Sequence, residues 1–141
     1  MSILRRLAPL ALLVAAAGCQ SPPAAPSVAA QDSLNSVVNM NPAPGTELHP
    51  GQAVTFSGTT GFTLATADVG TMYMAITDQS GRSLTSSIQE VVVHRGTADV
   101  TVSQTVSIPT DGATSVRVVF VMLPAGATVT KAGVQLSYPV R

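Results

Sequence analysis

A strict alternation of apolar and polar side chains between residues 98 and 108 most constrains how this chain can fold. The even positions are Ala98, Val100, Val102, Gln104, Val106 and Ile108, and every odd position between them is polar. Because successive side chains of a β-strand point to opposite faces, this pattern predicts a strand with one buried and one solvated face. Gln104 interrupts the apolar side and indicates a bulge or a shared edge.

The same period of two recurs along most of the chain. Further strands are predicted at residues 38–40, 54–56, 72–76, 84–94, 116–122 and 134–138. Turn-forming Pro, Gly and Asp residues separate these segments, and the abundance of Val and Thr favours strands over helices. Seven strands at these spacings predict an all-β fold, a single antiparallel β-sandwich.

Three turn-and-strand segments point to a family. They read NPAPG at residues 41–45, PGQAVTF at 50–56 and ITDQSG at 76–81. With them, residues 38–141 resemble the immunoglobulin-like modules of bacterial surface and envelope proteins. The resemblance implies an immunoglobulin-like sandwich for a domain predicted at residues 37–141, and it says little about function. The disulfide and core Trp of antibody domains have no counterpart here, because the chain has one Cys and no Trp.

The first eighteen residues have the layout of a secretory signal peptide. Arg5 and Arg6 precede an apolar run at residues 7–17, and small residues lead up to Cys19. Eleven helical residues rise only about 16 Å, which is too short to cross a hydrocarbon core of about 30 Å. We therefore expect residues 1–18 to be removed on export rather than to remain as a membrane span.

The four residues ending at Cys19 read AAGC and resemble the bacterial lipobox, although Ala16 stands where that family prefers Leu. The resemblance implies that diacylglycerol is attached to the Cys19 thiol and anchors the protein in a membrane. Gln20 in place of Asp implies sorting to the outer membrane. The alternative is cleavage after Ala17, which leaves Cys19 as a free thiol. That Cys19 is the only cysteine of an exported chain favours lipidation.

Residues 19–36 follow as a predicted tether. This segment is rich in Pro, Ala and Ser, and Asp32 is its only charged residue. Such a composition buries too little apolar surface to offset the entropy of ordering the chain. We expect it to hold the folded domain away from the membrane.

The charges and the scarce histidines exclude several function classes. Without residues 1–18, five basic and seven acidic residues remain, so the mature chain is near −2 and has no polybasic run for nucleic acid. His49 and His94 are isolated in the sequence, and neither has nearby partners with the spacing of a zinc site. We therefore predict no metal site, no cofactor and no catalytic residues.

The order of strands predicts which loops share an end of the sandwich. Turns at residues 42–51, 78–82 and 109–113 are expected at a membrane-distal end, whereas a long loop at 59–70 and turns at 95–96 and 124–127 are expected near the tether. The distal turns carry Glu47, His49, Asp78, Arg82 and Asp111. These five residues are the candidates for partner binding, because recognition often lies in loops held by a rigid scaffold. The alternative is that their charges only solvate turns.

These observations favour a non-catalytic envelope lipoprotein whose sandwich binds another protein, expected to be an envelope protein, either as an accessory to an envelope assembly or at the cell surface. The sequence leaves its oligomeric state open. A carbohydrate or peptidoglycan binding module is the second hypothesis, although sugar platforms usually need exposed aromatic side chains. Here only Tyr73 and Tyr138 are available, and the chain has no Trp. An enzyme is the third and weakest hypothesis.

Overall fold

The computed structural model describes residues 29–141, so the predicted signal peptide and Cys19 lie outside the described part of the chain. Its secondary structure consists of strands: β1 (Ser33–Asn41), β2 (Ala53–Asp78), β3 (Val91–Ser107), β4 (Ser115–Pro124) and β5 (Lys131–Pro139). Between residues 29 and 141 there is no helix of the length and hydrophobicity needed to cross a membrane. The predicted all-β class is confirmed for the described residues.

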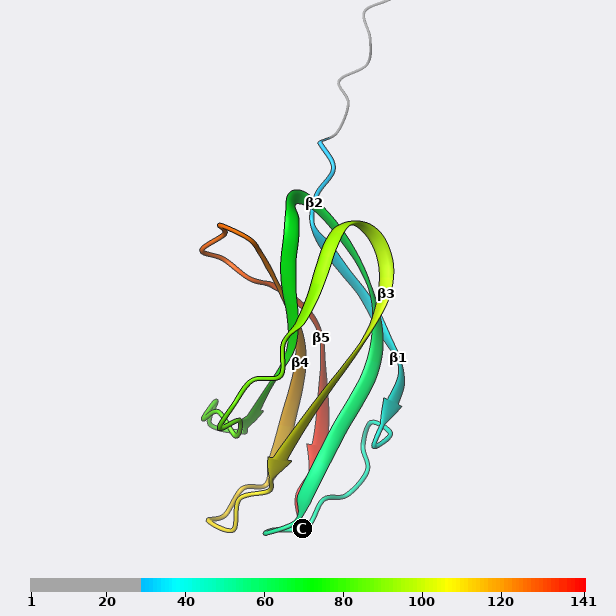
Figure 1. Cartoon of the computed structure of the whole chain (residues 1–141). Helices are drawn as coiled ribbons and strands as arrows, with labels where there is room; N and C mark the ends of the chain where they lie inside the picture. The colour runs from blue at the N-terminus through cyan, green and yellow to red at the C-terminus, as the bar shows by residue number, and fades with distance from the viewer. Residues whose placement is uncertain (1–28) are drawn as a thin grey trace, which may run out of the picture.

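The five strands form one antiparallel sheet around β2. The order is β1-β2-β4-β5, and β3 also pairs with β2. β2 is 26 residues long, and its first half pairs with β1 and β3 while its second half pairs with β3 and β4. In Figure 1, β2 rises along one side of the molecule, bends near its top and descends along the other, and β3 follows the same arch. The sheet therefore folds over into two facing layers.

A local break in the β2–β3 ladder produces the bend. Leu64 pairs with Gly96, the next pair is Val69 with His94, and residues 65–68 bulge out between them. Gly96 has a φ of 129°, which a residue with a side chain adopts only under strain. The prediction of seven separate strands is therefore wrong: β2 and β3 each pass through a predicted turn without ending, and five strands result.

The predicted apolar positions form the core between the layers. Phe56, Met74, Val118 and Phe120 are fully buried. The rings of Phe56 and Tyr138 meet edge to face with centroids 5.0 Å apart, which joins β2 to β5 across the core. The Tyr138 hydroxyl donates a hydrogen bond to the carbonyl of Pro42 (2.9 Å), and burial raises the pKa of Tyr138 to about 12.

The two lateral sides of the folded sheet differ. On one side β1 lies against β5, and Leu34 packs beside Gly133. On the other side both arms of β3 form the margin, and β3 has no strand partner there among residues 29–141. The core is therefore covered on the β1–β5 side and more open along β3.

Several sequence predictions need correction. The expected loop at residues 59–70 lies within β2, and Phe62 and Leu64 in this segment are buried. Gln104 marks no bulge, because the β2–β3 register is continuous around it. β1 begins at Ser33, so residues 33–36 of the predicted tether lie in a strand. Val134 is 47% exposed because the β4–β5 register shifts between Val119 and Val121.

Candidate interaction surfaces

The end where the chain enters the domain is organised by Asp32. Its Oδ1 accepts hydrogen bonds from the backbone N–H groups of Ala65 (2.7 Å) and Thr66 (3.0 Å), and its Oδ2 accepts one from the Thr66 hydroxyl. Burial acts to raise the pKa of Asp32, but these hydrogen bonds more than offset it, and the pKa is lowered. Asp32 thus fixes the start of the domain to the bulge of β2. The sequence pattern missed this role because Asp32 stands in a run of Pro, Ala and Ser.

Three connections gather around this tether end, as the loop alternation predicts. Arg95 pairs with Asp68 (2.8 Å) and donates a hydrogen bond to the carbonyl of Ala65 (2.5 Å). The backbone N–H of Ala125, in the β4–β5 turn, donates to the carbonyl of Val69 (2.9 Å). The bulge of β2, the bend of β3 and the β4–β5 turn therefore share one end of the fold.

At the opposite end the structure brings Asp78, Arg82 and Asp111 together. Arg82 donates two hydrogen bonds to the Asp111 carboxylate (2.6 and 2.9 Å), and its Nε donates to Asp78 (3.0 Å). Asp78 also accepts hydrogen bonds from the hydroxyl and N–H of Ser80. The Ser80 hydroxyl lowers the pKa of Asp78, and Arg82 lowers that of Asp111. The charges of Asp78, Arg82 and Asp111 are therefore paired with one another, and these contacts hold the 78–82 turn against the 109–113 turn.

Glu47 and His49 form a separate set at this end. Glu47 lies 3.7 Å from the Arg141 guanidinium, and Nδ1 of His49 is 3.0 Å from the Arg141 carbonyl. The 42–51 segment reaches the residue just before the 109–113 turn, because the N–H of Gly51 donates a hydrogen bond to the carbonyl of Ile108 (2.9 Å). The five candidate residues thus share one end as predicted, but they divide into two sets, each engaged within the chain.

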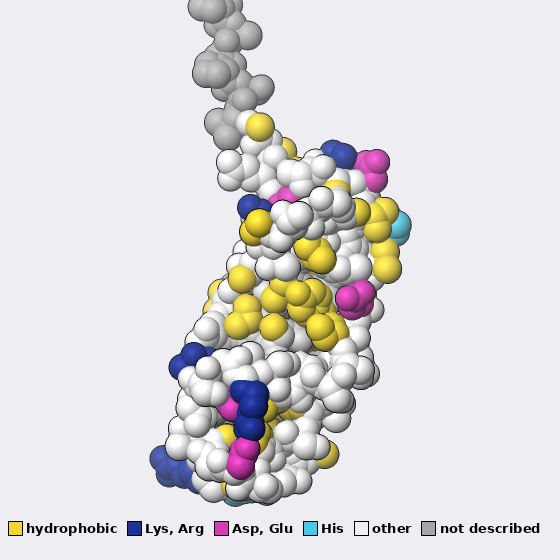
Figure 2. Space-filling model, turned by 90° about the vertical axis from the view of Figure 1, so that its left-hand side faces the viewer, with side chains coloured by type: hydrophobic (Ala, Val, Ile, Leu, Met, Phe, Trp, Pro, Cys, Tyr) yellow, Lys and Arg dark blue, Asp and Glu magenta, His cyan; other side chains and the backbone are white. Residues whose placement is uncertain are grey.

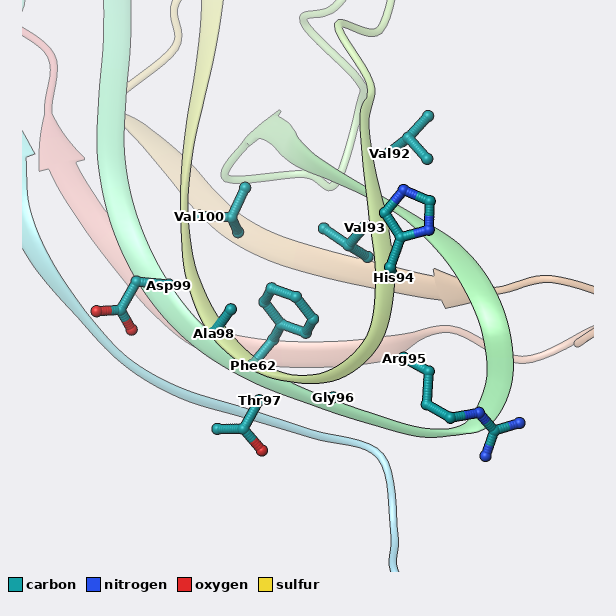
Figure 3. Close-up of a pocket in the computed structure, with 10 residues that line it drawn as sticks. All are labelled: Phe62, Val92, Val93, His94, Arg95, Gly96, Thr97, Ala98, Asp99 and Val100. Carbon is teal, nitrogen blue, oxygen red and sulfur yellow. The ribbon is translucent and has the colours of Figure 1, made fainter.

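A hollow of about 340 Å³ opens under the arch of β3 and was not predicted. Figure 3 shows Phe62, Val93, Ala98 and Val100 on the concave side of the bend, while Asp99 and Arg95 point away from it. Phe62 and Val93 are buried at its base, and Ala98 is exposed at its margin. The hollow is an apolar opening into the core on the side that no strand covers.

Only part of this open side is closed by the chain itself. The buried amide of Gln104 accepts a hydrogen bond from the N–H of Gln89 (2.8 Å) and donates one to the carbonyl of Ser87 (3.0 Å). The segment before β3 is thereby held over the lower half of the opening. The two hydrogen bonds of the Gln104 amide explain why a polar side chain occupies this core position. The upper half, under the arch, stays open.

Neither the metal-ligating side chains nor the comparisons with known proteins assign a function. In the part of the chain that the structure describes, no three His, Cys, Asp or Glu side chains lie close enough together to hold a metal ion. No known protein-family model matches the sequence, and no curated protein is significantly similar to it.

Proposed function

We propose that this protein is an envelope lipoprotein, anchored in the outer membrane by lipid on Cys19, whose folded domain binds another protein without catalysis. The AAGC segment supports the anchor, and the likeness of residues 38–141 to immunoglobulin-like envelope modules supports a binding role. Because β2 and β3 are each bent into two arms, the five strands comprise seven extended segments. This arrangement favours an immunoglobulin-like sandwich built from one folded sheet.

The hollow beneath the β3 arch is the observation that carries the binding proposal. Apolar side chains, among them Phe62 and Val100, line the hollow. The adjacent edge of β3 has no strand partner among residues 29–141. A partner segment in extended conformation can pair its backbone with such an edge and place an apolar side chain in the hollow. The partner we propose is therefore an envelope protein with an extended, apolar-containing segment.

Photo-crosslinking in intact cells tests this proposal. A photoreactive amino acid at Ala98 faces the hollow, and the same amino acid at Ser107 lies on the outward face of the same strand as the matched control. We expect a discrete crosslinked product from position 98 and none from position 107. Substitution Ala98→Glu, which brings a charge to the hollow, should abolish capture of that product, whereas Ser107→Glu should not.

The distal end is the competing binding surface. A variant with Glu47, His49, Arg82 and Asp111 all replaced by Ala removes the charges of that end. If the crosslinked product from position 98 persists in this variant, the hollow is the binding surface. If no product forms from position 98 in the wild type and a distal position crosslinks instead, the partner binds through the distal turns.

A further inference from the structure

The outer faces of the two layers differ in chemistry. In one layer the first half of β2 pairs with the second half of β3, and the outward positions of both are almost all Thr or Ser. Three cross-strand pairs of hydroxyls are hydrogen-bonded there at 2.8 to 3.0 Å, namely Thr55–Thr105, Thr59–Thr101 and Thr63–Thr97. This face is polar, as is usual for the solvated face of an antiparallel sheet.

The outer face of the other layer is apolar. There the second half of β2 pairs with β4, and core-facing pairs such as Met74 and Phe120 are fully buried, so the residues between them point outward. These outward residues include Tyr73, Ala75, Val119, Val121 and Leu123. Val121 is buried among partly exposed neighbours, and Val92 of β3 extends the patch and is 61% exposed. Among residues 29–141 no strand packs over this face.

Figure 2 looks onto the left-hand side of Figure 1, where β4 and the second half of β2 lie. Hydrophobic side chains gather over its middle, and charged side chains stand toward the margins. An apolar surface of this kind gains free energy when another surface excludes water from it, and a contiguous patch with a polar rim is typical of protein–protein interfaces. Tyr73 supplies an aromatic ring, a residue type enriched at the centre of such interfaces.

One acidic and one basic residue flank this apolar face. Arg117 of β4 lies on the same outer face, opposite Thr77 of β2. Glu90 is exposed and immediately precedes β3, whose first residue, Val91, pairs with Met72 of β2. Because β2 lies between β3 and β4, Glu90 and Arg117 lie on opposite sides of it, with the apolar residues between them.

These two charges are available to a partner. Within the part of the chain that the structure describes, neither Glu90 nor Arg117 forms an ion pair. Asp78, the carboxylate next to Arg117 in the β2–β4 register, is engaged by Arg82. A patch with an anion on one side and a cation on the other is self-complementary, because a two-fold axis through its centre brings each group opposite the other in a second copy.

We propose that two copies of this chain associate through their apolar outer faces, with Glu90 of each copy opposite Arg117 of the other. The two-fold axis passes near Ala75, whose small side chain lets the two sheets approach, and Tyr73 and Val119 are covered on either side of it. The margin of β3 and the hollow beneath its arch stay accessible to the protein partner proposed above. Dimerisation does not depend on lipid at Cys19.

Photo-crosslinking between differently tagged copies tests the dimer in intact cells. The cells produce two full-length versions of the chain that differ only in a C-terminal tag. A photoreactive amino acid at Tyr73 probes the apolar face, and the same amino acid at Thr59, on the outer face of the other layer, is the matched control. We expect position 73 to give a product of twice the mass of the chain that contains both tags, and position 59 to give none.

Charge reversal tests the pairing of the two copies. Glu90→Arg brings two positive charges together in the dimer, and Arg117→Glu brings two negative ones. Each variant alone should lose the two-tag product at least about tenfold, because like charges in contact cost several kcal/mol. Cells that produce one copy of each variant should recover it, since both opposite-charge pairs form again. Asp99→Arg, which reverses an exposed charge on the polar outer face, should leave the product unchanged.

Three results would overturn the proposal. The absence of a two-tag product from position 73, or a product from it that contains only a different protein, would show that the apolar face does not bind a second copy. A dimer that survives both charge reversals, or that the combined variants do not restore, would contradict the pairing of Glu90 with Arg117. Crosslinks from position 98 are scored separately, so the binding site under the β3 arch stands or falls independently of the dimer.

Discussion

The carboxylate of Asp32 accepts a hydrogen bond from the backbone N–H of Ala65 at 2.7 Å and so ties the first residues of the domain to the bulge of its longest strand. Residues 65–68 have no pairing partner in β3 at this point, so the side chain of Asp32 supplies acceptors that the sheet does not. The bend that gives the sheet two layers therefore depends on a residue just outside β1.

Removing the Asp32 carboxylate should destabilise the domain. In Asp32→Ala the N–H groups of Ala65 and Thr66 lose their acceptor, which costs about 1–3 kcal/mol when such groups stay buried. The free energy of unfolding, measured with urea on the mature chain carrying Cys19→Ala, checks this. Gln31→Ala, at an exposed neighbouring position, is the control and should behave like the parent chain.

Acid should destabilise the same contact. Because the folded state lowers the pKa of Asp32, the ionised carboxylate contributes stability that is complete above the unfolded pKa and is lost as the pH falls through the folded pKa. The free energy of unfolding should therefore be flat near neutrality and decline below about pH 4. Asp78 and Asp111, whose pKa values are also lowered, act in the same direction. Asp32→Asn should decline less steeply than the parent; an identical slope would contradict this role.

The beginning of the folded unit can be located by truncation. A fragment of residues 29–141 keeps Asp32 and all of β1, whereas residues 37–141, the domain predicted from the sequence, lack both Asp32 and Leu34. Both should give β-type circular dichroism, but the shorter fragment should melt at a lower temperature, by about 4–8 °C for each kcal/mol lost. Equal melting temperatures would mean that residues 29–36 contribute nothing to the fold.

Gly58 should not tolerate a side chain. A Cβ at this position would lie 2.8 Å from Sδ of Met40 and 2.9 Å from the Phe120 ring, across the core between the two layers. Gly58→Ala should therefore cost about 1–3 kcal/mol through overpacking. At Gly133 the nearest atoms would be 3.4 Å away, so Gly133→Ala should change stability by less than about 0.5 kcal/mol. Chemical unfolding of the two variants side by side makes the comparison.

Strand positions could be predicted because the period-two pattern is local. Val102, Val106 and Val116, all expected inside, are buried. The grouping of the loops at two ends could also be predicted from the sequence, because each extended segment crosses the fold once. Whether residues 59–70 form a loop or a bulged strand is decided by pairing with β3, which lies some 35 residues further along the chain. No local pattern contains that information.

The candidate sites, like the strands, could be predicted from the sequence only in part. Arg82 and Asp111 could be placed at one end from strand order, but not the hydrogen bonds that pair them. The hollow under β3 depends on a bend of the whole ribbon, and the sequence around Ala98 reads as an ordinary strand. Cys19, outside the described residues, remains a prediction from the residues that precede it.

Lipidation of Cys19 is tested most directly by feeding labelled palmitate to cells that produce the wild-type protein or the Cys19→Ala variant. We expect label on the wild-type protein, a mature chain that begins at Cys19, and an unlabelled, soluble Cys19→Ala form. Cleavage before Gly18, with no label on the wild-type protein, would contradict it.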